Sequence, residues 1–102
     1  MTVKELNESS FSEAIQSNKV VIIDFFAHWC GPCKTLSPIL EEVSNEGFSV
    51  FSVDVDENRD LSQKFSVSSI PTVLFFKNGK KVDSFVGVRE KEDIIDMANS
   101  HG

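Results

Sequence analysis

The chain has 102 residues, of which 40% are hydrophobic and 25% are charged, as is usual for a small globular protein. This length is enough for one hydrophobic core and leaves no room for a second, so we expect a single domain over residues 1–102. Sixteen acidic against ten basic residues give a formal net charge of −6, which disfavours nucleic acids and anionic membranes as partners.

The first two predicted elements are a short strand and an amphipathic helix. Residues Val3–Leu6 are compatible with an edge strand. The serines of Asn7–Ser10 are of the type that caps a helix, and Phe11, Ala14 and Ile15 follow on one stripe. We therefore expect a helix to begin within this polar segment.

The segment Val20–Phe26 predicts a central strand. Its residues are β-branched and aromatic with almost no polar alternation, which is typical of a strand buried on both faces. Asp24 interrupts it, and burial would raise the pKa of that carboxyl. Such an acid can exchange protons near neutral pH, so one hypothesis is that Asp24 accepts a proton from Cys33, directly or through water. The alternative is an acid that reaches solvent or a backbone amide.

A long helix is predicted after Cys33. Apolar residues recur there at spacings of three and four, so the helix should reach about Glu46 and stop at Gly47; these residues are Leu36, Ile39, Leu40 and Val43. Pro38 lies inside it and is expected to kink it.

The second half of the chain predicts three more strands and two helices. A strand is expected over Phe48–Val55 and a short helix over Asp60–Phe65. Thr72–Lys77 and Lys81–Val86 flank Asn78-Gly79, which strongly indicates a hairpin turn. The last helix carries Ile94, Ile95, Met97 and Ala98. This order predicts an α/β fold with a mixed sheet and helices on both faces.

The segment Trp29-Cys-Gly-Pro-Cys-Lys34 is the strongest chemical motif. It lies between the central strand and the long helix, where open α/β sheets place their sites. Gly31 allows the backbone to bend, and Pro32 suits a first helical turn because it needs no N–H there. A helix N-terminus favours a thiolate, so Cys30 is expected to have the lower pKa and to act as the nucleophile, with Cys33 as the resolving cysteine.

Three other interpretations of the cysteine pair are weaker. A structural disulfide would close a loop of only four residues, worth roughly 2 kcal/mol. A zinc site needs about four ligands, and only His28 and His101 are of the right type, so we expect no metal. Buried unpaired thiols would leave the flanking residues unexplained.

Several other residues have two interpretations from the sequence alone. Trp29 is either a substrate-facing platform or part of the core, with the core slightly favoured. Gly87 is either a bulge that allows a partner backbone to approach or an ordinary loop glycine. His28 and Lys34 have a solvated surface as their default, although Lys34 would add positive potential near a thiolate.

The segment Val21–Lys34 closely resembles the active-site segment of the thioredoxin family. Ile70-Pro71-Thr72, Phe76–Gly79 and Phe85–Gly87 resemble the rest of that family's framework in order and spacing, so the likeness covers nearly the whole chain. The resemblance implies the thioredoxin fold, with a central mixed five-stranded sheet and about four helices. It also implies a cis bond before Pro71.

The resemblance further implies a protein-disulfide reductase without a tightly bound cofactor. Its partners would be disulfide-containing client proteins and a thioredoxin reductase that supplies electrons from NADPH. Asp24 matches the family's buried acid, and Pro38 matches its helix kink. The implied substrate-binding residues are Trp29, Gly31, Pro32, Ile70, Pro71 and Gly87.

Two positions depart from the family pattern. Phe26 stands where many members have Trp, and Ser52 where many have Lys. The second departure leaves Asp24 without a cationic neighbour, which makes its strength as a base harder to infer.

Two other functions stay open alongside the reductase. One is a binding or chaperone-like module that uses the same surface without turnover, and the other is an oxidant or isomerase with a different redox potential. The longest apolar runs, over 20–23 and 25–27, are too short to span a membrane, and the first ten residues contain no apolar leader segment. Both cysteines lie in one motif, which suits a reducing compartment, so we expect a cytoplasmic monomer.

Overall fold

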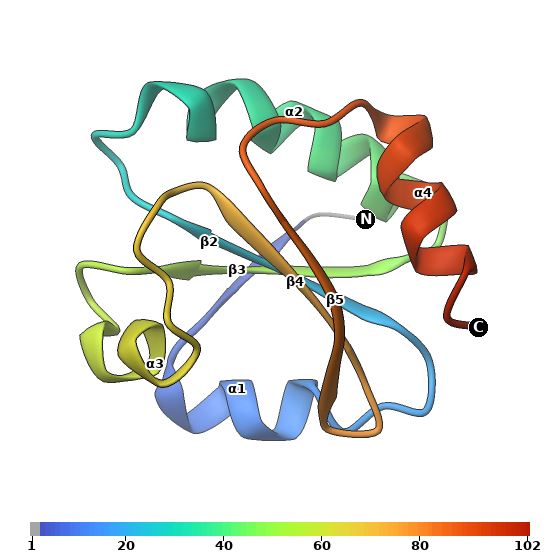
Figure 1. Ribbon diagram of the computed structural model, residues 1–102, viewed down its shortest axis with the longest axis horizontal. Coiled ribbons are helices and arrows are strands. Elements are labelled where there is room, and N and C mark those ends of the chain that lie inside the picture. The colour runs from blue at the N-terminus through green and yellow to red at the C-terminus, as the bar shows by residue number, and fades with distance from the viewer. Residues whose placement is uncertain (1–2) are drawn as a thin grey trace.

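The computed structural model describes residues 3–102, and the first two residues of the segment in which no leader was expected lie outside that range. Its elements follow the predicted order (Figure 1). They are β1 (Lys4–Leu6), α1 (Glu8–Ala14), β2 (Val21–Phe26), α2 (Gly31–Asn45), β3 (Ser49–Asp54), α3 (Arg59–Lys64), β4 (Thr72–Lys77), β5 (Lys80–Val86) and α4 (Lys91–Asn99).

All five strands form one mixed sheet in the order β1-β3-β2-β4-β5. Strands β1 and β2 both pair in parallel with β3, whereas β4 pairs antiparallel with β2 and β5 antiparallel with β4. Helices α2 and α4 cover one face of the sheet and α1 and α3 the other (Figure 1). The expected mixed sheet, with β1 at an edge and β2 at the centre, is confirmed.

Strand β2 is buried on both faces because each face is covered by helices. Its side chains alternate, so that Val21, Ile23 and Phe25 enter the cluster on the α1/α3 face. Ile22 enters the cluster on the α2/α4 face. Asp24 has the same parity as Ile22, so its carboxylate is directed toward α2.

Aromatic side chains dominate the core on the α1/α3 face. Phe11, Phe25, Phe65 and Phe76 form five ring pairs with centroids 5.3 to 6.4 Å apart. Burying one such side chain contributes roughly 1.5–3 kcal/mol. The α1/α3 face of the sheet is therefore covered by a compact aromatic cluster.

The core on the α2/α4 face is built from the predicted helical stripe. Leu36, Leu40 and Val43 of α2 are fully buried and share a cluster with Ile94 and Ala98 of α4. The positions on α2 confirm the spacing of three and four that predicted this helix. The same packing holds α2 against the sheet and so places its first turn at the end of β2.

The structure changes some expected element boundaries. Asn7, and not a serine, caps α1: its side chain accepts the Ser10 N–H at 3.0 Å, and the Ser10 hydroxyl accepts the Asn7 N–H in return. Serines 9 and 10 are therefore inside the helix. Pro38 lies within α2 as expected, and the kink there stays a prediction.

Two turns have the positive φ angles that glycine accepts readily. Gly47 follows α2 with φ of +98°, and Asn78 and Gly79 connect β4 to β5 with φ of 54° and 80°. Both central residues of that hairpin turn thus have the conformation for which Asn-Gly is favoured. Among residues 3–102, no helix is long and apolar enough to cross a membrane.

Candidate active site

The two cysteines lie at the junction of β2 and α2. Cys30 is the N-cap residue of α2 and Cys33 is in its first turn. A disulfide joins them, and their Cα atoms are 5.3 Å apart. The helix begins at Gly31, earlier than the apolar stripe alone indicated, because Pro32 fits the first turn without a donor.

The backbone of α2 directs an amide toward the first sulfur. The Cys33 N–H donates to Cys30 Sγ across 3.2 Å. Since the first amides of a helix have no partners within the helix and lie at the positive end of its dipole, they stabilise negative charge on that sulfur. This geometry favours a Cys30 thiolate once the disulfide is reduced.

Burial alone does not distinguish the two cysteines, because each is only 4% exposed. Their surroundings do differ. Cys30 Sγ lies 3.8 Å from the Ile70 carbonyl oxygen, on the side of the loop that enters β4. Cys33 instead lines the pocket that contains Asp24.

Asp24 is a buried acid beside the cysteine pair. It is 4% exposed, and its Oδ1 is the one buried side-chain oxygen or nitrogen in residues 3–102 without a hydrogen-bond partner. Burial raises the pKa of the Asp24 carboxyl to about 7, as expected from its position in an apolar strand. The alternative of a carboxylate that reaches solvent is wrong for this side chain.

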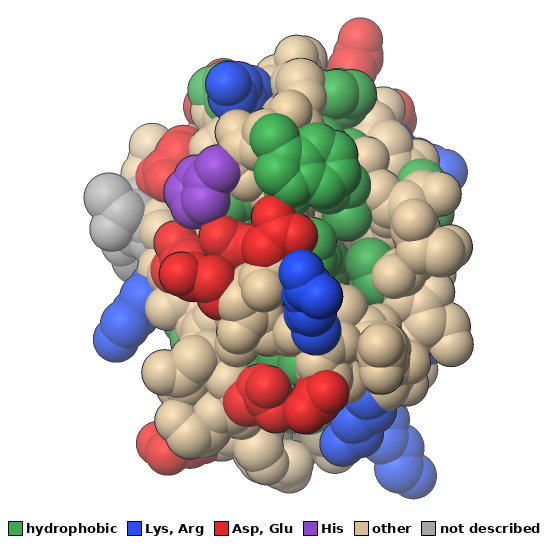
Figure 2. Space-filling model, turned by 90° about the vertical axis from the view of Figure 1, so that its left-hand side faces the viewer, with side chains coloured by type: hydrophobic (Ala, Val, Ile, Leu, Met, Phe, Trp, Pro, Cys, Tyr) green, Lys and Arg blue, Asp and Glu red, His purple; other side chains and the backbone are tan. Residues whose placement is uncertain are grey.

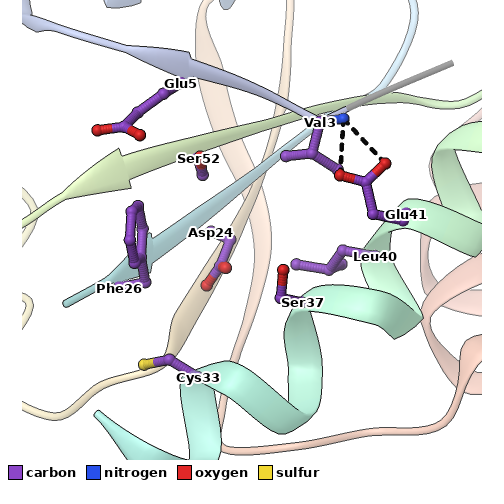
Figure 3. A pocket seen from close by; sticks show the side chains of 9 residues that line it. All are labelled: Val3, Glu5, Asp24, Phe26, Cys33, Ser37, Leu40, Glu41 and Ser52. Carbon is purple, nitrogen blue, oxygen red and sulfur yellow. Dashed lines mark hydrogen bonds between the residues drawn. The ribbon is translucent and has the colours of Figure 1, made fainter. Parts of the chain in front are cut away.

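A pocket of about 200 Å³ surrounds the carboxyl of Asp24 (Figure 3). Ser52 and Phe26, the two departures from the family pattern, both line it. No Lys or Arg is among the described residues that form this lining, so the expected lack of a cationic neighbour is confirmed. The lining is completed by Val3, Glu5, Cys33, Ser37, Leu40 and Glu41.

Trp29 is 70% exposed, so the slight preference for a core residue was wrong. Its indole Nε1 donates to Asp56 Oδ2 across 2.8 Å, which holds the ring at the surface. The sequence analysis missed Asp56, since an acidic residue in a loop has no periodic signal. On the face in Figure 2, hydrophobic side chains lie beside a group of acidic ones.

The residues just before β4 and just after β5 form another side of the cysteine site. The Ile70–Pro71 bond is cis, which confirms the expectation drawn from the family resemblance. The Gly87 N–H donates to the Pro71 carbonyl across 2.8 Å, so these two residues are brought together. Gly87 has φ of +93° and open space where a Cβ would lie, so its backbone angle, and no close approach within the chain, favours glycine.

His28 is exposed, as expected, and packs beside the pocket residue Phe26. Its ring lies edge-on against Phe26 with centroids 5.2 Å apart, and its Nε2 is 3.3 Å from Asp54 Oδ2. Glu5, His28 and Asp54 have ligand-type atoms within 4.8 Å of one another, the one such group found among residues 3–102. The contact between the His28 ring nitrogen and the buried Asp54 carboxylate accounts for this grouping.

This arrangement can transfer two electrons by making and breaking one disulfide. A sulfur at a helix N-terminus, a second sulfur one turn later and a nearby acid near neutral pKa supply the nucleophile, the leaving group and a proton site. Trp29, which precedes Cys30, and Val86 and Val88, which flank Gly87, provide exposed apolar surface.

Comparisons with known proteins agree with this geometry. The family model described as Thioredoxin matches residues 2–100. A thioredoxin of Staphylococcus haemolyticus is 41% identical, with 99% of each chain covered. One of Chlamydia caviae is 43% identical, with 97% of this chain and 98% of the relative covered.

Solved structures are similar as well. The X-ray structure of Fasciola hepatica thioredoxin superimposes with a TM-score of 0.89 at 31% identity, covering 98% of this chain and all of the other. A Plasmodium falciparum thioredoxin gives a TM-score of 0.86 at 35% identity, with 98% and 100% covered.

Proposed function

This chain belongs to the thioredoxin family and is a protein-disulfide reductase, and we propose that Cys30 is its nucleophile, Cys33 its resolving cysteine and Asp24 its proton acceptor. The observation that carries the proposal is the asymmetry of the pair. The Cys30 sulfur receives a helix amide, whereas Cys33 shares a pocket with Asp24.

In the first step the Cys30 thiolate attacks one sulfur of a substrate disulfide. A mixed disulfide forms, the substrate disulfide breaks, and one substrate thiolate leaves. Trp29, Gly31, Pro32, Ile70, Pro71 and Gly87 bind the substrate chain in this proposal. The Ile70 carbonyl, 3.8 Å from Cys30 Sγ, lies where a backbone segment carrying the attacked sulfur would pass.

In the second step Cys33 attacks the Cys30 sulfur. The mixed disulfide breaks, the second substrate thiolate leaves, and the Cys30–Cys33 disulfide forms, so two electrons pass to the substrate. Cys33 must lose its proton to attack. The Asp24 carboxylate accepts that proton, directly or through water, because its pKa of about 7 lets it take up and release protons near neutral pH.

We infer that the oxidised protein is recharged by a thioredoxin reductase with electrons from NADPH, which makes it an electron carrier. Family membership supports this partner and client proteins with disulfides. A cytoplasmic monomer is part of the same proposal, because a reductase must be kept reduced by its surroundings. Coupled oxidation of NADPH in the presence of a reductase tests the recharge step.

Trapping of intermediates tests the two cysteine roles. Cys33→Ser is expected to accumulate mixed disulfides with client proteins through Cys30, because the second step is removed. Cys30→Ser is the matched control and is expected to accumulate none. Mass spectrometry of the trapped species identifies the attached cysteine, and trapping through Cys33 would reverse the assignment.

The reduction potential separates a reductase from an oxidant. Equilibration with a reference dithiol is expected to place the pair near about −270 mV, the range of reducing thioredoxins. A value near about −120 mV would make it an oxidant with the same fold.

A further inference from the structure

The pocket at Asp24 contains a buried polar atom that the protein itself does not satisfy. Asp24 Oδ1 has no hydrogen-bond partner, and leaving such a group unpaired costs about 1–3 kcal/mol. A pocket of about 200 Å³ is large enough for several water molecules. Its lining offers the hydroxyls and carboxylates that ordered water needs.

Polar residues lead from this carboxyl to the surface along one row of the sheet. Ser52 of β3 pairs in register with Asp24 of β2 on one side and with Glu5 of β1 on the other. Side chains at paired positions share a face and lie about 5 Å apart. Exposure rises along the row, from buried Asp24 through half-buried Ser52 to exposed Glu5.

The row is polar on only one side of Asp24. In the opposite direction its register partner is Val73 of β4, which is fully buried, and Phe85 of β5 follows. A proton therefore has no polar path across that half of the sheet. Figure 3 shows the Asp24 side chain between Ser52 and Cys33.

Glu41, another acidic residue of the pocket, is already hydrogen-bonded within the protein. Both carboxylate oxygens of Glu41 on α2 accept the Val3 N–H, at 3.3 and 3.2 Å. This contact ties the start of β1 to α2 and forms a wall of the pocket. Glu5 is left as the acidic group at the exposed end of the row, with His28 and Asp54 beside it.

We propose that the pocket is a hydrated proton exit, in which Ser52 positions the water that links Asp24 to Glu5 and solvent. The exit rests on the proposed role of Asp24 and adds what happens next: the proton taken from Cys33 leaves along the Ser52 row, which returns Asp24 to its ionised form. Ser52 is thus a positioning residue that acts through Asp24.

Three variants test the role of Ser52. Ser52→Val replaces the hydroxyl by a methyl group and suits a strand, Ser52→Thr keeps a hydroxyl, and Ser49→Val is the matched control. Ser49 lies on the same strand but outside the pocket lining. Circular dichroism checks that each variant is folded.

Carbon-13 NMR of the Asp24 carboxyl in the oxidised protein is the first readout, since the disulfide removes thiol titration. Ser52→Val is expected to raise the titration midpoint by about one unit, because less water reaches the carboxylate. Its Asp24 resonance should broaden because proton exchange with solvent slows. Ser52→Thr and Ser49→Val should match the parent protein. An unshifted midpoint, or a shifted one with an unbroadened resonance, would overturn the exit.

The second readout is the decay of a mixed disulfide between Cys30 and a small aromatic thiol across pH 6 to 9. Ser52→Val is expected to slow this step about fivefold at pH 7, as a one-unit rise in midpoint requires. An equal slowing by Ser49→Val would overturn the route. Ser37 lines the same pocket from α2, so slower decay in Ser37→Val but not in Ser52→Val would overturn it as well.

Asp24→Asn separates this proposal from the function on which it rests. If that variant keeps the parent pH dependence of decay, Asp24 is not the acceptor and the exit fails with it. If it removes the pH dependence while Ser52→Val changes nothing, the acceptor role stands and the exit alone is overturned.

Discussion

The two faces of the sheet differ in what they bury. Strand β2 sends Ile23 and Phe25 into the aromatic cluster of the α1/α3 face, and between them Asp24 into a pocket on the α2/α4 face. One face gains stability from packed rings, and the other carries a buried acid with an unpaired oxygen. A strand fixed from one side can therefore hold a destabilising group on the other.

The caps of helices α1 and α2 differ in the same way. On the α1/α3 face, Asn7 caps α1 with a side chain whose contacts are structural. On the α2/α4 face, the cap position of α2 is occupied by Cys30, which we propose as the nucleophile. The cap of α2 is thus part of the proposed chemistry, whereas the cap of α1 is structural.

The largest expected effect is on the aromatic face. Phe11 contacts the rings of Phe25, Phe65 and Phe76, so Phe11→Ala leaves a cavity and should lower the free energy of unfolding by about 3–5 kcal/mol. Urea unfolding measures this loss, and disulfide reduction below the transition should be nearly unchanged. A loss below about 1 kcal/mol would show that the aromatic cluster on the α1/α3 face contributes little to stability.

Asp24→Asn should instead make the protein more stable than the parent, most strongly at alkaline pH. Burial raises the pKa of Asp24 from its ordinary value of 3.8 to about 7. Between about pH 4 and pH 7 the folded state therefore keeps a proton that the unfolded chain has already released. Stability of the parent therefore falls as pH rises through this window, by up to about 4 kcal/mol, since each pKa unit corresponds to about 1.4 kcal/mol.

The asparagine variant has no such ionisation. Its advantage over the parent should grow from pH 4 to pH 8 and then level off, as measured by urea unfolding at each pH. Asp83→Asn is a useful control, because the hydrogen bond to His101 lowers the pKa of Asp83. The shift is opposite in direction to that of Asp24, so removing this carboxyl should not produce an advantage that grows with pH. An advantage that does not vary with pH would contradict the buried ionisation.

The smallest effect is expected at the cap of α1. Asn7→Ala removes the bond to the Ser10 N–H and should cost about 1 kcal/mol of unfolding free energy, whereas Asn7→Asp should keep most of it. Thermal unfolding followed by circular dichroism distinguishes the two variants. Equal stability of both would assign the capping to other contacts.

Local sequence patterns determined most of the architecture. The apolar run of β2, the stripe from Leu36 to Val43 and the Asn78-Gly79 turn each predicted their elements, because helix periodicity, burial on two faces and turn conformation depend on neighbouring residues. The cysteine pair and its position at a strand-to-helix junction were predicted for the same reason. The cap of α1 was misassigned because Asn and Ser satisfy the same donors.

The remaining parts of the site depend on contacts between distant segments. Trp29 is exposed because Asp56, 27 residues away, accepts its indole N–H. The proximity of Gly87 to Pro71 arises from pairing of β4 with β5. Residue type and local pattern do not encode such partners.

The sequence by itself therefore determined which residues are candidates for the chemistry and which elements carry them: a Cys-Gly-Pro-Cys turn, a buried strand with one acid, and helices with a regular apolar stripe. Only the tertiary structure decided that Asp24 has an unpaired oxygen and lies in a pocket that Ser52 and Glu5 also line. The physical reason is that burial and solvation are properties of the register between strands, which is set when the sheet assembles.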